Sequence, residues 1–265
     1  CAIVHRGSEA EYSVFSDCHN TGNISVVDND KTSSSGAVAM GGIIGRISNY
    51  FISGKTIVPI ALDITEGFYA KVENCTNSAT IENSSYSTGG LITRQTGARV
   101  CATGGIVGYA SGLKAKSADI IGCKNTGKLL GGYANNCLLG GISGQTNYVN
   151  IEKATVEAEF GDSSLSEHQL SAVGGIVGSS LNTLTVKDSF VDISGTLTPT
   201  PIGIGVLQGY VRSGTAEYTN IQVKANLTYA GGNKALEVTA ENVTTATDLY
   251  GPTALKATGI TYWNK

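Results

Sequence analysis

The chain has 265 residues, of which only 15% are charged, and its formal net charge is −3. Charged residues make up about 25% of an average domain, and no basic cluster is present here, so the composition excludes a nucleic-acid-binding protein. No apolar run approaches the ~20 residues that a membrane-spanning helix needs, so the sequence predicts no transmembrane segment.

Glycine is abundant, with 35 residues, whereas the chain has only 4 prolines and 1 tryptophan. Val, Ile, Thr, Tyr and Ser alternate with Gly and Asn through most of the sequence. This pattern is typical of many short strands joined by turns, and it predicts an all-β protein.

The chain opens with CAIVHR (1–6), which aligns with the later GGIVGY (104–109). This alignment predicts that the chain begins inside a repeat, with Cys1 at the position of a glycine. Two interpretations stay open at this stage. Either the chain was cut from a longer repeat protein, or Cys1 is the mature N-terminus of a lipoprotein and carries a lipid anchor.

A glycine-rich half-motif recurs along the chain. It reads GGIIG (41–45), GGIVG (104–108), GGISG (140–144), GGIVG (174–178) and GVLQG (205–209). Stacked copies would place their third residues in one apolar ladder: Ile3, Ile43, Ile106, Ile142, Ile176 and Leu207. The glycine pairs are expected to form tight corners, because Gly reaches positive φ at little cost.

A second half-motif, C-x-N-x-G-x-(I/L), follows the first. It reads CHNTGNI (18–24), CTNSATI (75–81) and CKNTGKL (123–129), with diverged copies VDISGTL (191–197) and IQVKANL (221–227). Alternation along a strand directs every second residue to one face, which predicts an amide ladder of Asn20, Asn77 and Asn125. In this alignment Ile193 and Val223 replace the asparagine in the later copies.

The two linked half-motifs resemble the GLUG motif, a repeat of large secreted and surface proteins of bacteria. The resemblance covers roughly residues 1–230, with gaps at 46–70 and 82–103, and the closing ITYWNK (260–265) is similar to the aromatic segment that trails such arrays. The resemblance implies a β-solenoid, on the outer cell surface or secreted.

The repeat predicts a single-stranded parallel β-helix, because one unit of 30–36 residues buries its apolar face only by stacking on its neighbours. A right-handed coil is expected, since parallel crossovers are right-handed by default. Residues 1–230 would form the repeats, with insertions near 46–70 and 82–103. Residues 231–265 would form a C-terminal cap with a short helical turn at 234–241.

Six cysteines are present, and five fall into two vertical ladders: Cys18, Cys75 and Cys123 in one, Cys101 and Cys137 in the other. Buried thiols are expected, since free Cys behaves as a small apolar residue, although a stacked pair could also reach disulfide geometry. His5, His19 and His168 show no metal-ligand spacing with any cysteine pair, so we expect no metal site and no cofactor.

Acidic residues offer little for catalysis. Asp28 and Asp30 form the densest pair but lie in an Asn/Asp-rich turn, and Glu157 and Glu159 alternate on an exposed strand face. Catalysis is therefore not the main prediction, and a polysaccharide lyase or hydrolase is kept as the alternative function. A group of three or more carboxylates, or a carboxylate with Lys or Arg, converging on one face of the solenoid would favour it.

The residue after each closing glycine is expected to point outward, as would several tyrosines near the insertions. The predicted ligand-facing surface comprises Arg46, Tyr50, Tyr109, Tyr133, Tyr148 and Tyr210. Tyr combines a flat apolar face with a polar tip, which suits contacts with sugars or proteins. The sequence thus predicts a non-catalytic surface module that binds glycans or cell-surface proteins, or acts as a spacer.

Overall fold

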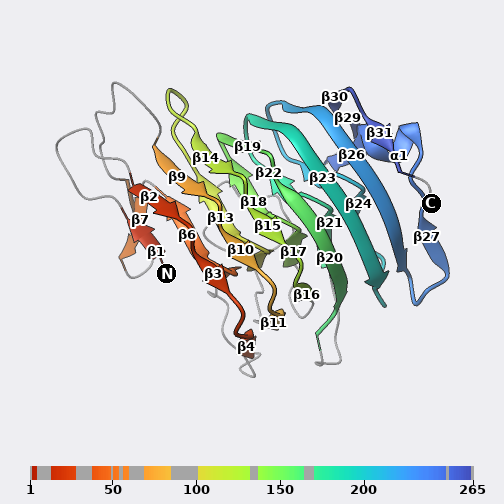
Figure 1. The fold of residues 1–265 in the computed structure, drawn as a ribbon, viewed down its shortest axis with the longest axis horizontal. Helices are drawn as coiled ribbons and strands as arrows, with labels where there is room; N and C mark the ends of the chain where they lie inside the picture. Colours follow the sequence, from red (N-terminus) through yellow and green to blue (C-terminus); the bar gives the residue numbers. More distant parts are fainter. Residues whose placement is uncertain are drawn as a thin grey trace.

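The structure is a computed structural model of the chain, and it describes residues 2–4, 13–27, 38–48, 50–53, 56–59, 69–84, 101–131, 137–163, 170–248 and 251–263. These residues form a parallel β-solenoid, as the sequence predicts. Strands of successive turns lie side by side along the long axis of the molecule, from the N-terminus to the C-terminus (Figure 1). The described part contains a single five-residue helix, α1 (Ala240–Thr244).

Three sheets form the faces of the solenoid, and their strands pair in parallel except at the C-terminal end, where β28 (Thr245–Asp248) pairs with β29 (Gly251–Ala254) and β26 (Ala216–Tyr229) with β27 (Lys234–Leu236) in the antiparallel sense. We name the eight-stranded sheet A, the sixteen-stranded sheet B and the five-stranded sheet C. Four consecutive turns between Cys101 and Tyr229 each run from sheet C through sheet A to sheet B. Stacking of this kind buries a continuous core that no single turn could bury.

Sheets A and C carry the glycine-rich half-motif. Sheet C contains β5 (Ala39–Gly41), β12 (Cys101–Gly104), β17 (Cys137–Gly140), β21 (Leu170–Gly174) and β24 (Gly203–Gly205). Sheet A contains β1 (Ala2–Val4), β6 (Ile44–Ser48), β13 (Val107–Ser111), β18 (Ser143–Asn147), β22 (Val177–Ser180), β25 (Gln208–Val211), β28 (Thr245–Asp248) and β29 (Gly251–Ala254).

Sheet B bends once in each turn. Before the bend lie β2 (Ser13–Ser16), β9 (Ala70–Glu73), β14 (Ala118–Ile121), β19 (Val149–Glu152) and β30 (Lys256–Thr258). After it lie β3 (His19–Asn20), β4 (Ile24–Val27), β10 (Thr76–Asn77), β11 (Ile81–Ser84), β15 (Lys124–Asn125), β16 (Lys128–Gly131), β20 (Thr155–Asp162) and β31 (Thr261–Tyr262). The long strands β23 (Leu184–Thr196) and β26 (Ala216–Tyr229) continue through it.

Each bend is made by one residue in the left-handed conformation, with φ between 50° and 64°. The residues are Asp17, Asn74, Gly122, Lys153, Asp188, Asn220 and Gly259. Six of the seven are Asp, Asn or Gly, the types that adopt this conformation most readily. The bend therefore recurs at the same point in every turn and fixes which residues follow it into the core.

Two predicted ladders are confirmed. The backbone N–H groups of Ile43, Ile106, Ile142 and Ile176 each donate to the carbonyl of the next residue in the apolar ladder, ending at Leu207. In the amide ladder, Nδ2 of Asn20 donates to Oδ1 of Asn77 at 2.8 Å, and Nδ2 of Asn77 donates to Oδ1 of Asn125 at 2.9 Å.

The strand register corrects two alignments. Ala2 pairs with Arg46, and Arg46 pairs with Tyr109, so CAIVHR does not align with GGIVGY and Ile3 lies outside the apolar ladder. Asn125 pairs with Val156, and Val156 pairs with Val191, so this copy of the motif begins at Ser189, two residues before the predicted 191–197. The later turns therefore continue the amide ladder with a valine row, which consists of Val156, Val191 and Val223.

The expected role of the glycine pairs is also wrong, because none of them has positive φ in the described residues. Space is the reason for glycine instead. A Cβ on Gly105 would lie 2.2 Å from Nδ2 of Asn125, and one on Gly175 would lie 2.8 Å from Cγ1 of Val191. The second glycine of each pair thus lets the corner pack directly on the amide ladder or the valine row.

The segments outside the regular turns are partly described. β7 (Tyr50–Ser53) and β8 (Thr56–Pro59) form an antiparallel pair within 46–70, and most of 82–103 lies outside the described residues. In the tail, β30 and β31 add a last parallel rung to β26, and β27 (Lys234–Leu236) pairs with β26 in the antiparallel sense. The helical turn begins at Ala240, later than the 234–241 expected.

Candidate functional site

The outer face of sheet B carries two regular rows of mostly polar side chains just before the bend. The first row is Val14, Lys71, Asp119, Asn150, Thr185, Glu217 and Lys256. The second row is Ser16, Glu73, Ile121, Glu152, Lys187, Thr219 and Thr258. Alternation turns these residues outward because their neighbours in each strand, such as Ile120 and Ile151, are buried in the core.

A groove of about 280 Å³ opens on this face across three adjacent strands, β14, β19 and β23. It is lined by Asp119, Ile121, Asn150, Ile151, Glu152, Thr185 and Lys187. Small-molecule pockets start at about 300 Å³, so the groove suits a single ring or short polar group rather than a large ligand. We call it the sheet B groove.

The polar groups of the groove are ordered by a cross-strand hydrogen bond. Nδ2 of Asn150 donates to Oδ1 of Asp119 at 3.0 Å. Asp119 is half-buried, and its burial raises the pKa of its carboxyl group, while the Asn150 hydrogen bond and the charge of Lys71 act in the opposite direction. The charge of Glu152 also raises this pKa, so the two carboxylates influence each other within the groove.

Ion pairs neutralise most of the charge elsewhere on the outer face of sheet B. Nζ of Lys124 lies 2.7 Å from Oε2 of Glu157, and Nζ of Lys256 lies 2.8 Å from Oε1 of Glu217. Lys71 likewise pairs with Glu73 in the same strand. Exposed pairs of this kind contribute little to stability. Because the paired charges cancel, the described part of this face has no large electrostatic potential of either sign.

The predicted carboxylates are partly located. Glu157 and Glu159 are exposed on β20, as expected, and Glu159 pairs with Lys128 at 2.5 Å. Asp28 and Asp30 lie outside the described residues, as do His5 and His168. Nδ1 of His19 lies 2.8 Å from Oγ1 of Thr76. Within the described ranges, no group of three or more His, Cys, Asp or Glu side chains could hold a metal ion.

The predicted ligand-facing residues do not form one surface. Arg46 is half-buried on β6, and its guanidinium carbon lies 4.9 Å from the ring centroid of Tyr109. Tyr148 is half-buried and has a left-handed backbone conformation directly before β19, at a different point of the turn from the sheet B bend. Tyr50 lies on β7, but its side chain is outside the described part of the structure, and so is all of Tyr133.

The expectation that Tyr109 and Tyr210 point into solvent is wrong, since they are only 2% and 1% exposed. The glycine before each of them brings sheet A against sheet C. A Cβ on Gly209 would lie 2.6 Å from the carbonyl oxygen of Val173. Tyr210 consequently packs with Leu138 and Ala172 of sheet C. Gln145 and Ser179, in the same row, are buried for the same reason.

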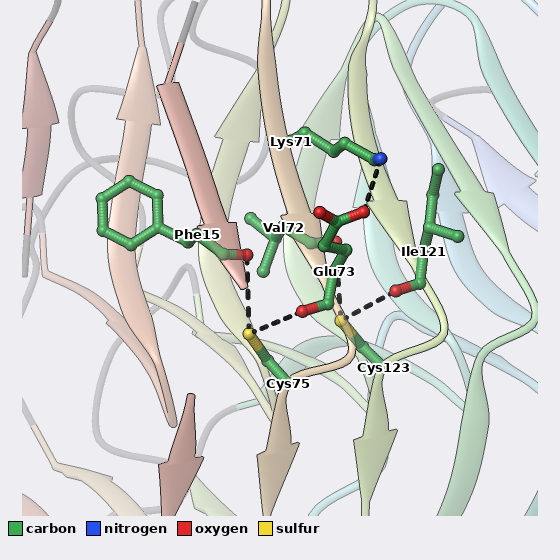
Figure 2. A network of polar contacts seen from close by, with 7 residues as sticks. All are labelled: Phe15, Lys71, Val72, Glu73, Cys75, Ile121 and Cys123. Atoms are coloured by element: carbon green, nitrogen blue, oxygen red, sulfur yellow. Dashed lines mark hydrogen bonds and ion pairs between the residues drawn. The ribbon is translucent and has the colours of Figure 1, made fainter. Parts of the chain in front are cut away.

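The five cysteines in the described part of the chain are free thiols, and all of them except the half-buried Cys18 are buried. Sγ of Cys75 donates to the carbonyl of Glu73 at 3.2 Å, and Sγ of Cys123 donates to that of Ile121 at 3.5 Å (Figure 2). Burial raises the pKa of Cys123 to about 12 and also raises that of Cys75. Because the thiolate is the reactive form, these residues are structural rather than nucleophilic.

Sequence reasoning missed the sheet B groove, although a signal for it was present. Each cysteine of the first ladder is the last residue of a six-residue segment that has an Asp, Asn or Gly at its fifth position: SVFSDC (13–18), AKVENC (70–75) and ADIIGC (118–123). VNIEKA (149–154) and LTVKDS (184–189) match the same spacing. Alignment on this bend residue would have placed Asp119, Asn150 and Thr185 in one outward row.

Comparisons with known protein families, with curated proteins and with solved structures find no match for this chain. In the described part of the chain, no helix has both the length and the apolar character needed to span a bilayer. The site geometry is therefore the basis for any functional assignment.

Proposed function

We propose that this chain is a non-catalytic β-solenoid module of a bacterial surface or secreted protein, and that it binds glycan in the sheet B groove. One observation carries the proposal. Asp119, Asn150, Glu152, Thr185 and Lys187 line one groove together with the partly exposed Ile121, at the surface of a parallel sheet.

This arrangement matches the chemistry of a sugar ring. The amide, carboxylate, hydroxyl and ammonium groups provide donors and acceptors for sugar hydroxyls, and Ile121 provides an apolar floor for the C–H groups. The backbone beneath is fixed by parallel pairing of β14, β19 and β23. Binding would therefore require little reorganisation of the protein. The resemblance to GLUG repeats supports the surface location.

Affinity gel electrophoresis against a panel of plant, host and bacterial polysaccharides tests the proposal. We expect at least one polysaccharide to retard the protein, and we expect Asn150→Ala to abolish the retardation. Asn226→Ala is the matched control, because Asn226 is also exposed on sheet B but lies outside the groove. Equal retardation of both variants would refute the groove as the binding site.

A second candidate function, glycoside hydrolysis, is favoured by the two interacting carboxylates of the groove. Asp119, whose pKa is raised, would donate its proton to the leaving oxygen, and Glu152 would accept a proton from the attacking water. Incubation with each retarding polysaccharide separates the two functions. New reducing ends that disappear in Asp119→Asn would establish hydrolysis, whereas retardation without shortening of the polymer supports a binding module.

A further inference from the structure

Trp263, the single tryptophan of the chain, is 51% exposed near the C-terminal end of sheet B. Its ring meets that of Phe190 edge to face, with centroids 5.5 Å apart and an interplanar angle of 72°. Its backbone N–H donates to the carbonyl of Val223 at 2.9 Å, which fixes it beside β26. We call Phe190 and Trp263 the aromatic platform.

Polar side chains border the aromatic platform. Gln222 is exposed and pairs in register with Phe190. Two residues further along these strands, Asp192 accepts from Nζ of Lys224 at 2.7 Å. Because strand residues two apart share a face, these three polar side chains and Phe190 lie on the same outer surface. Large exposed aromatic side chains with a polar rim are a common sign of a ligand site.

We propose that the aromatic platform is a second saccharide subsite, which binds a pyranose ring of a neutral polysaccharide. The C–H face of the sugar would stack on Trp263, and its hydroxyls would bond to Gln222 and to the Asp192–Lys224 pair. The rim favours a neutral polymer over a polyanion, since Lys224 already has its charge compensated by Asp192.

This inference rests on the proposed glycan function. The two sites share one strand, so a glycan bound in the groove could extend to the aromatic platform. Thr185 and Lys187 of β23 line the sheet B groove, and Phe190 follows three residues later, across the bend at Asp188. At ~3.3 Å per residue, the separation along the strand is about 10 Å. A single polysaccharide chain is long enough to contact both sites.

The single tryptophan makes a direct test available. Its fluorescence is titrated with neutral hexasaccharides built from glucose, mannose, galactose or xylose, and with a galacturonate hexamer as the anionic comparison. We expect at least one neutral hexamer to shift the emission to shorter wavelength and to reduce acrylamide quenching at least twofold. If no neutral hexamer changes the emission, or if only the galacturonate hexamer does so, the inference is overturned.

Variants measured by affinity gel electrophoresis provide the second readout. Trp263→Ala should weaken binding of the responding polymer at least tenfold and Trp263→Phe should largely retain it. Ile202→Ala, at another exposed apolar residue, should have no effect. If Trp263→Ala lowers the unfolding temperature but leaves the affinity unchanged, Trp263 only covers Phe190 and the inference fails.

The same measurements distinguish failure of the inference from failure of the proposed function. If Asn150→Ala abolishes retardation while Trp263 emission never responds, the groove binds glycan and the aromatic platform does not. If Trp263 responds and Asn150→Ala binds as tightly as the unchanged protein, the platform is a saccharide site and the groove is not.

Discussion

The amide ladder of the first turns and the valine row of the later turns occupy the same position in the solenoid but are stabilised in different ways. Asn20, Asn77 and Asn125 are linked through their side chains by hydrogen bonds of 2.8 and 2.9 Å. The valines are fully buried and pack through apolar contacts alone. Both fill the same space beneath the glycine-rich corner, so shape is the common requirement.

The two rows differ where they meet. Nδ2 of Asn125 is buried and has no hydrogen-bond partner in the described residues, because the next residue in the row is Val156. A row of amides needs an acceptor on the next turn, whereas a row of valines ends at no such cost. A polar ladder is therefore stable in its middle and weak at its ends.

The largest expected effect tests the shape that both rows share. In Gly105→Ala, the new Cβ would lie 2.2 Å from Nδ2 of Asn125. In Gly141→Ala, it would lie 2.5 Å from Cγ1 of Val156. We expect each variant to lose about 3 kcal/mol of unfolding free energy, since backbone atoms also block the space. Urea denaturation measures the loss. Gly22→Ala is the control, with its nearest atom 3.9 Å away, and a similar loss there would contradict the packing argument.

Next in size is a change that breaks the amide ladder in its middle. Asn77→Val gives the first turns the side chain of the later ones, but it removes the acceptor of Asn20 Nδ2 and of the Ala79 N–H. We expect a loss of about 2 kcal/mol in urea denaturation, because buried polar groups are left unpaired. Asn20→Val, at the half-buried end, should lose about half as much. Equal stability of Asn77→Val and the unchanged protein would contradict the ladder's contribution.

A smaller loss of unfolding free energy is expected when a buried side-chain hydrogen bond is removed from the turns that carry the valine row. The hydroxyl of Tyr218 donates to Oε1 of Gln208 at 2.8 Å, and Nε2 of Gln208 donates to Oγ of Ser180 at 2.6 Å. Tyr218→Phe should lower the unfolding free energy by about 1 kcal/mol, since Gln208 loses a donor in the core. Tyr229→Phe, at a half-buried site, serves as the control in thermal unfolding. An unchanged melting temperature for Tyr218→Phe would show that this hydrogen bond is not needed.

Much of the fold was predictable because stacked turns repeat the same residues at the same positions. The apolar ladder, the amide ladder and the two cysteine ladders follow directly from motif spacing. The register at 191–197 did not, because Ser189 and Val191 have replaced the cysteine and asparagine that mark it. A pattern with period two fits equally well when it is moved by two residues.

The candidate site was less predictable than the fold. Tyr109 and Tyr210 follow a glycine and look exposed, yet glycine is also what lets sheet A contact sheet C and bury them. The sheet B groove combines residues from β14, β19 and β23, and its outline depends on side-chain sizes in three different turns. Local sequence shows which side chains point outward, but not where they leave a hollow.

The smallest expected effect lies on the outer face of sheet B and concerns Asp119. Burial raises the pKa of its carboxyl group, so the folded protein holds this proton more tightly than the unfolded chain, in which an aspartate has a pKa of about 3.9. The wild-type protein therefore loses stability as the pH rises from about 3.9 through the higher folded pKa. Asp119→Asn does not titrate, and its amide oxygen still accepts from Asn150.

We expect Asp119→Asn to match the wild-type protein at about pH 3, below both pKa values, and to become more stable by a few tenths of a kcal/mol at pH 7. Urea midpoints measured for both proteins at each pH give this difference, and the other acidic groups cancel in it. If the wild-type protein instead gains stability over the variant as the pH rises, the attraction of Lys71 outweighs the burial of Asp119. The groove would then favour the charged carboxylate, which is the form that accepts hydrogen bonds from sugar hydroxyls.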